Sequence, residues 1–122
     1  MQYVRVYADA AGESHFGDVE VPLASVDFAP PAPPVNLSVF HPAARYGFLV
    51  GPAGWYGDWQ PTPQRQIIFY LAGEIEAETS DGEVRHFGPG SVTLVEDTTG
   101  KGHRSRNVGL GDAVLAVVQL PD

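Results

Sequence analysis

The 122-residue chain contains no cysteine and few basic residues. Without cysteine there is no disulfide framework, no thiolate metal site and no cysteine nucleophile. Only 7 lysines and arginines stand against 15 aspartates and glutamates, which gives a formal net charge of −8. A chain this acidic repels the phosphates of nucleic acids and anionic membrane surfaces, so neither is an expected partner.

Long apolar runs are also missing. Residues 1–9 alternate polar and apolar side chains and include Arg5, so they lack the continuous apolar segment of a secretory leader. The longest apolar runs, residues 67–73 and 113–118, are far shorter than the roughly 20 residues of a membrane-spanning helix. We therefore expect a soluble, cytoplasmic protein.

Glycine and proline are abundant, with 14 and 11 residues. This density disfavours long helices and favours short strands joined by tight turns. Strand-like segments recur at short intervals, about nine in all, and no segment has a helical pattern. The predicted fold class is all-β, a sandwich or barrel. The predicted strands are residues 3–7, 18–28, 36–40, 46–50, 66–72, 74–79, 83–87, 91–95 and 113–120, with a loop over residues 51–63.

One hairpin is predicted in detail. Asp81 and Gly82 are a strong signal for a two-residue turn between two of these strands. With that turn, Ala77 would pair with His86 on the apolar side. The three glutamates of residues 74–79 alternate with apolar residues, so we expect them on a solvated face.

Two groups of residues have the spacing of a family's motifs. In the first, Gly54 and Gly73 enclose polar residues at positions 60, 62 and 66, and in the second Gly100 is followed by His103 and Asn107. Both groups resemble the two signature motifs of the cupin family, over about residues 54–73 and about residues 88–107. The resemblance implies a small double-stranded β-helix, or jelly-roll barrel, with residues 1–122 as a single domain.

The resemblance also places the metal ligands of a typical cupin, three His and a Glu, at four positions of this chain. Those positions hold Gln60, Thr62, Gln66 and His103, and only the imidazole is a strong ligand for a divalent transition metal. We therefore expect no metal and no cofactor, and a metal-dependent dioxygenase becomes the less favoured function. A metal site rebuilt from His103 with Asp97 or His41 remains an open alternative.

The interior of such a barrel can hold a small molecule without a metal. Alternation puts Gln66 and Tyr70 on one face, and the resemblance puts that face inside. We expect these two side chains, Gln60 and His103 to form a polar cluster that binds the ligand in an apolar cavity. The alternative is that the amides only satisfy one another.

Neighbouring residues add to this site. Trp59 is expected to wall the mouth of the cavity, with packing in an ordinary core as the equal alternative. Asp97 precedes His103 and is a candidate to orient its imidazole, although acidic residues at such positions often only cap turns. Three basic residues around His103, at positions 101, 104 and 106, could attract an anion or simply be solvated.

Two functions from different classes follow. One is a metal-independent isomerase, lyase or cyclase in which His103 is the general acid or base. The resemblance makes this class plausible, because cupins include enzymes that transfer protons on sugars and polyketide-like carbonyl compounds. The other is a non-catalytic module that binds or senses a small molecule. A single titratable group among neutral amides favours the first only slightly.

A homodimer is also expected. Residues 66–71 are apolar on both faces of the predicted strand, and only one face can point into the interior. The second apolar row therefore needs a cover. The N-terminal strand, residues 3–7, is a candidate for this cover, either from the same chain or from a second copy.

Overall fold

A computed structural model describes residues 1–122 and consists of strands, turns and loops. The predicted all-β class is confirmed. None of its elements is a helix, so it has no helix of the length and hydropathy that crossing a membrane requires. The strands are β1 (Gln2–Ala8), β2 (Ser14–Glu20), β3 (Ala24–Val26), β4 (Val35–Leu37), β5 (Arg45–Gly51), β6 (Tyr56–Gln60), β7 (Gln66–Ala72), β8 (Ile75–Thr79), β9 (Val84–Phe87), β10 (Val92–Val95), β11 (His103–Asn107) and β12 (Ala113–Gln119).

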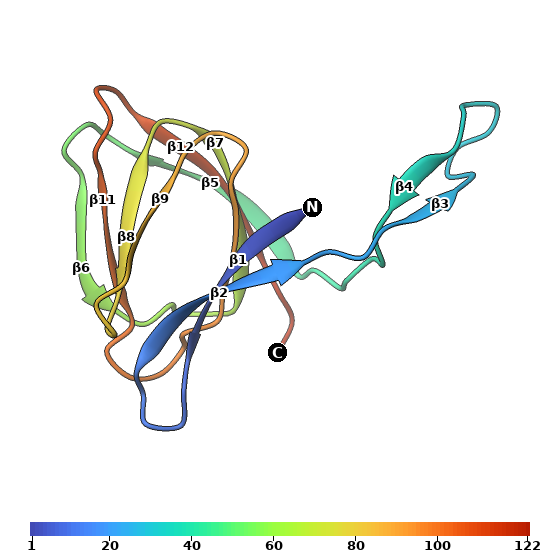
Figure 1. The fold of residues 1–122 in the computed structure, drawn as a ribbon. Coiled ribbons are helices and arrows are strands. Elements are labelled where there is room, and N and C mark those ends of the chain that lie inside the picture. The colour runs from blue at the N-terminus through green and yellow to red at the C-terminus, as the bar shows by residue number, and fades with distance from the viewer.

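The strands form two facing sheets and a separate hairpin (Figure 1). The larger sheet has six strands in the order β2-β1-β10-β7-β12-β5, and the smaller has four in the order β6-β11-β8-β9. All pairs are antiparallel except β1 with β10. The sequence suggests residues 3–7 as a cover for the outer apolar face of β7, either from the same chain or from a second copy. In the structure β1 is a strand of the larger sheet, so it does not cover that sheet's outer face within its own chain.

The hairpin of β3 and β4 extends away from both sheets as an arm (Figure 1). The pattern predicts one strand over residues 18–28, but the structure splits this segment at Pro22, which has no N–H to give to a ladder. Four prolines within residues 30–34 form the tip of the arm, where they end both strands. The arm leads directly into β5, an edge strand of the larger sheet.

The sequence pattern predicts neither β6 nor β11. β6 lies in the predicted Gly- and Pro-rich loop, and β11 is polar, with the sequence HRSRN. β11 pairs with both β6 and β8, and its two arginines lie opposite glutamates of β8. Arg104 donates to Glu78 at 2.7 Å, and Arg106 donates to Glu76 at 2.9 Å. These cross-strand pairs explain why a charged segment is stable as a strand and why the glutamates face outward.

The predicted register of the β8–β9 hairpin is wrong by one residue. Ala77 pairs with Arg85 instead of His86. Residues 80–82 form a three-residue loop, and Gly82 takes a φ of 91°, the left-handed conformation that such loops use at their last position. Since a one-residue slip reverses the faces of a strand, His86 points outward and is exposed.

His15 joins the turns of two hairpins. Its Nε2 lies 2.8 Å from Asp9 in the β1–β2 turn, and its Nδ1 lies 3.0 Å from Asp81 in the β8–β9 turn. Hydrogen bonds to Asp9 and then Asp81 raise the pKa of His15. A ring that donates from both nitrogens carries a positive charge, so these contacts link the ends of the two sheets by charge.

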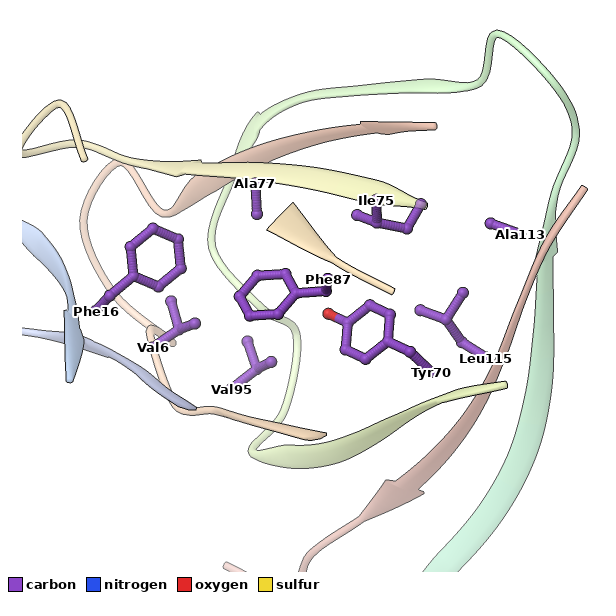
Figure 2. Close-up of a cluster of buried hydrophobic side chains, with 9 residues drawn as sticks. All are labelled: Val6, Phe16, Tyr70, Ile75, Ala77, Phe87, Val95, Ala113 and Leu115. Atoms are coloured by element: carbon purple, nitrogen blue, oxygen red, sulfur yellow. The ribbon is translucent and has the colours of Figure 1, made fainter. Parts of the chain in front are cut away.

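The core lies between the two sheets. Figure 2 shows its nine buried apolar side chains converging from both sheets, with the rings of Tyr70 and Phe87 stacked at 5.2 Å between centroids. On β8, buried Ile75 and Ala77 alternate with the outward glutamates, as predicted. The nine residues are Val6, Phe16, Tyr70, Ile75, Ala77, Phe87, Val95, Ala113 and Leu115.

Candidate functional site: a cavity with a buried Asp–His pair

A cavity of about 180 Å³ lies between the two sheets. Most of the buried apolar core residues form part of its wall, so the core encloses the cavity and does not fill the interior completely. The remaining lining comes from β5, from the segment around β6, and from β7, β10 and β11. Its polar members are Gln60, Thr62, Gln66, Tyr70, Thr93, His103 and Ser105.

His103 is the first residue of β11 and lines this cavity. Its Nδ1 lies 2.6 Å from Oδ2 of Asp97, in the loop after β10. The Asp97 side chain is fully buried, whereas that of His103 is 22% exposed. The structure therefore brings the Asp97 carboxylate to the imidazole, in the position that orienting the ring requires.

The loop between Asp97 and His103 is compressed by close backbone packing. Gly100 and Gly102 both have a φ of 76°, in the left-handed region. A Cβ at Gly100 would overlap the carbonyl oxygen of Gly12, and a Cβ at Gly102 would overlap that of Gln60. Glycine is required at both positions, because of the left-handed backbone and because there is no room for a Cβ. The close packing of this loop therefore fixes the position of His103, the first residue of β11, relative to Asp97.

The second oxygen of Asp97, Oδ1, is buried and has no hydrogen-bond partner. Burying a carboxylate is costly unless it is paired, so the short bond to His103 is its main compensation. The carboxylate favours a proton on Nδ1 of His103, which makes Nε2 the proton acceptor of the neutral ring. Nε2 has no hydrogen-bond partner in the protein.

The amides lie where the sequence predicts them. Gln60 pairs with His103 across β6 and β11, and both residues line the cavity. Gln66 also lines the cavity, and its Oε1 accepts a long hydrogen bond of 3.4 Å from Gln119. These amides are therefore only partly engaged within the protein and retain capacity for a ligand.

Tyr70 is buried in the cavity wall, and its hydroxyl lies 3.3 Å from that of Thr93. Burial raises the pKa of Tyr70 to about 12, since a phenolate would lose its hydration there. The phenol is therefore neutral over the physiological range. It offers a hydroxyl group to the cavity and adds no charge.

The structure separates Trp59 from the other predicted site residues. It does not line the cavity: its ring lies 4.1 Å from Nζ of Lys101 and 4.9 Å from Cζ of Arg104. Trp55 lines the cavity instead and packs so closely on Gly57 that a Cβ there would be 2.7 Å from its ring. Sequence alternation could not show this, because Trp55 comes just before a strand that the sequence did not predict, β6, and Trp59 lies within it.

No cationic or anionic side chain lines the cavity. Arg104 and Arg106 pair with glutamates of β8, and Lys101 rests on Trp59, so the basic residues around His103 are directed elsewhere. Glu96, next to Asp97, pairs with Arg5 and Arg65. Burial opposes ionisation of Glu96, but hydrogen bonds from these two arginines outweigh it and lower its pKa.

The residues at the metal-binding positions of typical cupins do not fit a divalent transition metal. All four positions line the cavity, but three hold neutral oxygen donors, and the hydroxyl of Thr62 already donates to the carbonyl of Gln64 at 2.9 Å. No three His, Cys, Asp or Glu side chains lie together in a group that could hold a metal ion. His41, a candidate for a rebuilt site, lies in the exposed segment after β4.

Asn107, which matches the end of the second motif, has a structural role. Its Nδ2 donates to the carbonyl of Gly111 at 2.8 Å and to those of Gly51 and Pro52 at 3.0 and 3.1 Å. Its Oδ1 accepts from the backbone N–H of Gly109 at 2.9 Å. This side chain thus joins the end of β11 to the end of β5 and to the following turn, away from His103.

Comparison with known proteins identifies the fold. No protein-family profile and no curated protein sequence matches the chain. The cupin domain of Cnp3 from Schizosaccharomyces pombe is similar with a TM-score of 0.53 and 17% identity, over 89% of this chain and 73% of that chain. A cupin domain from Bordetella pertussis Tohama I is similar with a TM-score of 0.50 and 14% identity, over 70% of this chain and all of that chain (100%).

A putative ethanolamine utilization protein Q from Salmonella typhimurium LT2 covers 99% of this chain and 96% of its own at 15% identity, with a TM-score of 0.49. The two cupin domains show that this chain has the cupin fold, as its motifs predicted. Identities this low extend the likeness to the fold alone.

Proposed function

We propose that this cupin-fold protein binds a small uncharged metabolite in its cavity and that His103 transfers a proton to or from the bound molecule. The observation that carries this proposal is the fully buried Asp97 carboxylate, bonded at 2.6 Å to an imidazole in the cavity wall. Burying a carboxylate is costly, so a core that serves packing alone gains nothing from this one. An imidazole oriented by a carboxylate is suited to general acid–base chemistry.

The cavity limits the class of ligand. Its volume, about 180 Å³, is smaller than the roughly 300–1,000 Å³ of typical ligand pockets, so it suits a small metabolite. Its lining carries no ionic side chain apart from the imidazole, which disfavours anions such as phosphates and carboxylates. The amides of Gln60 and Gln66 can each donate to a carbonyl or hydroxyl oxygen.

These groups support a proton shift next to a carbonyl. Nε2 of His103 takes a proton from the carbon beside the carbonyl, and the electrons of that C–H bond move to the carbonyl oxygen. An amide N–H of Gln60 or Gln66 stabilises the resulting enolate by hydrogen bonding. Return of the proton from Nε2 to another position gives an isomer, with no net gain or loss of protons. Isomerases, lyases and cyclases that act on carbonyl compounds can begin with such a step.

The second candidate function is binding without catalysis. It is favoured because the lining holds few groups that can exchange protons. Apart from the imidazole, the lining has only Tyr70 as a titratable side chain, and this phenol is neutral and bonded to Thr93. A sensor or carrier needs only the shape of the cavity and its hydrogen-bonding amides. In that case the Asp97–His103 pair positions Nε2 as a hydrogen-bond acceptor for the ligand and moves no proton.

The two functions differ in whether the protein exchanges the ligand's carbon-bound protons with solvent. Small uncharged carbonyl compounds are screened for binding by NMR, and those that bind are incubated with the protein in D₂O. We expect deuterium to appear beside the carbonyl with wild type. With His103→Gln, binding should persist and exchange should slow by about 10² or more, the usual contribution of a positioned proton-transfer group.

His86→Gln is the matched control, because His86 is exposed on the outer side of β9 and does not line the cavity. It should exchange at the wild-type rate. A compound that binds wild type in the cavity yet keeps all its carbon-bound protons would support the binding module for that compound. Exchange that is unchanged in His103→Gln would remove His103 from the reaction.

A further inference from the structure

The outer face of the larger sheet is uncovered and apolar over three neighbouring strands. Inward residues of β5, β7 and β12 line the cavity, so the residues between them face outward. None of the nine outward residues is charged. They are Tyr46, Phe48 and Val50 of β5, Val114, Ala116 and Val118 of β12, and Ile67, Phe69 and Leu71 of β7.

This outer face is exposed to a degree that a folded chain seldom tolerates. Tyr46 is 78% exposed, Phe48 70% and Val50 56%, and on β7 Phe69 is 38% and Leu71 52% exposed. Single exposed apolar residues are ordinary, but a continuous face of this kind marks an interaction site.

The projecting arm is the second uncovered apolar surface. Its strands pair only with each other, and a two-stranded hairpin alone is at best marginally stable in water. Phe28 and Phe40 form a ring pair at 6.1 Å and are 56% and 72% exposed. Val39 is 76% exposed, and Leu23 and Val35 are also exposed. The arm therefore needs apolar contact from outside itself.

We propose that two copies of this chain pair by exchanging these arms, so that the arm of each copy covers the outer face of the other. The two surfaces match in chemistry and belong to one chain, and a two-fold axis satisfies both of them with a single kind of contact. The chain segment that follows the arm leads into β5, which begins at Arg45 and is the first strand of the outer face. The two surfaces are therefore close together in the sequence. Figure 1 shows the arm directed away from its own sheets, as exchange requires.

The available area is sufficient for a stable pair. The five aromatic residues of the two surfaces are Phe28, Phe40, Tyr46, Phe48 and Phe69. An aromatic side chain buries roughly 150–250 Å², so the exposed fractions of these five amount to about 600 Å² per copy. The exposed aliphatic residues bring this total to the roughly 800 Å² per partner of a standard interface.

Light scattering on purified protein tests the pair. Wild type at micromolar concentration should have twice the 13.1 kDa mass of one chain. Phe48→Glu on the outer face and Phe40→Glu in the arm should each give the single-chain mass, because each places a charge in the apolar contact. Val84→Glu is the control, since Val84 is an exposed apolar residue on β9 of the other sheet. It should leave the mass doubled.

Circular dichroism shows whether each variant keeps the wild-type fold, so that loss of the pair is not confused with unfolding. A wild-type protein of single-chain mass would overturn the proposal. So would a doubled mass that survives both Phe48→Glu and Phe40→Glu.

Crosslinking tests the exchange of arms itself. Because the natural chain has no cysteine, an introduced cysteine is the only thiol that can react. ¹⁵N-labelled Phe40→Cys and unlabelled Phe48→Cys are refolded together and treated with a bis-maleimide. A link between residues 40 and 48 that joins a labelled to an unlabelled peptide is the expected result. A chain carrying both substitutions that links only within itself would show the arm packed on its own sheet and would overturn the exchange.

Discussion

Replacing Asp97 with asparagine tests the central feature of the site with almost no change in shape. In wild type, Oδ2 of Asp97 accepts from Nδ1 of His103 at 2.6 Å in a fully buried position. A hydrogen bond to an ionised group contributes about 1.5–3 kcal/mol, against about 1 kcal/mol for a neutral pair. Asp97→Asn should therefore weaken the preference for the Nδ1–H tautomer by about 0.5–2 kcal/mol. At about 1.4 kcal/mol per tenfold, this is a shift of about 2- to 30-fold.

Long-range ¹H–¹⁵N NMR spectra distinguish the two neutral tautomers of each of the 4 histidines. We expect the neutral His103 ring to carry its proton on Nδ1 in wild type and to gain the Nε2–H form in Asp97→Asn. Glu96→Gln is the matched control, because Glu96 pairs with Arg5 and Arg65 and not with His103. An unchanged His103 tautomer in Asp97→Asn would refute the reasoning.

The same variant separates positioning from proton transfer. Asp97 acts through His103, so proton exchange on a bound carbonyl compound should fall in Asp97→Asn by no more than the same factor, about 30-fold at most. That loss is smaller than the loss of about 10² expected for His103→Gln, which removes the transferring group itself. Equal losses in the two variants would mean that Asp97 does more than orient the ring.

Three further predictions concern stability and titration. Gly102→Ala should lower the free energy of unfolding in urea far more than Gly54→Ala, since both have a left-handed φ but only Gly102 lacks room for a Cβ. Equal losses would contradict the close packing. Tyr70, with a pKa of about 12, should stay protonated at about pH 11 and ionise there only when urea unfolds the chain, as ultraviolet absorbance can show. Stability from this buried phenol should be lost as pH rises from about 10 to about 12. The raised pKa of His15 means that its contribution is full below about pH 6.5 and is lost as pH rises through the folded-state pKa. The difference in stability between wild type and His15→Gln should therefore be larger at about pH 5.5 than at about pH 9, and a constant difference would contradict the charged bridge.

Motif spacing and strand alternation both reflect backbone geometry, which is why residues they singled out lie around one cavity. Gln60, Gln66, Tyr70 and His103 come from three different strands, yet all four line one cavity. The inward side of β7 followed from simple alternation, since residues two apart on a strand share a face. Trp59 was predicted at the same site, but β6 turns its ring toward Lys101 and Arg104.

Strands were missed where stability comes from partners far away in the chain. β11 reads as a basic loop until Glu76 and Glu78 of β8 lie opposite its arginines. The hairpin register failed for a local reason: Asp81-Gly82 suits both a two-residue and a three-residue loop, and the packing of the two faces selects the longer one.

The sequence by itself determined the fold class, the inward row of β7 and the neutral character of the metal-binding positions. Each of these depends on properties local to the chain, namely turn-forming residues, alternation along a strand and the donor chemistry of a side chain. Only the tertiary structure decided that Asp97 meets His103, that an arm projects from the sheets and that the outer face of the larger sheet is bare. These features depend on how segments distant in the sequence pack together. For example, the backbone of Gly12 and of Gln60 packs closely against the loop that places His103 beside Asp97, and no local sequence pattern predicts such contacts.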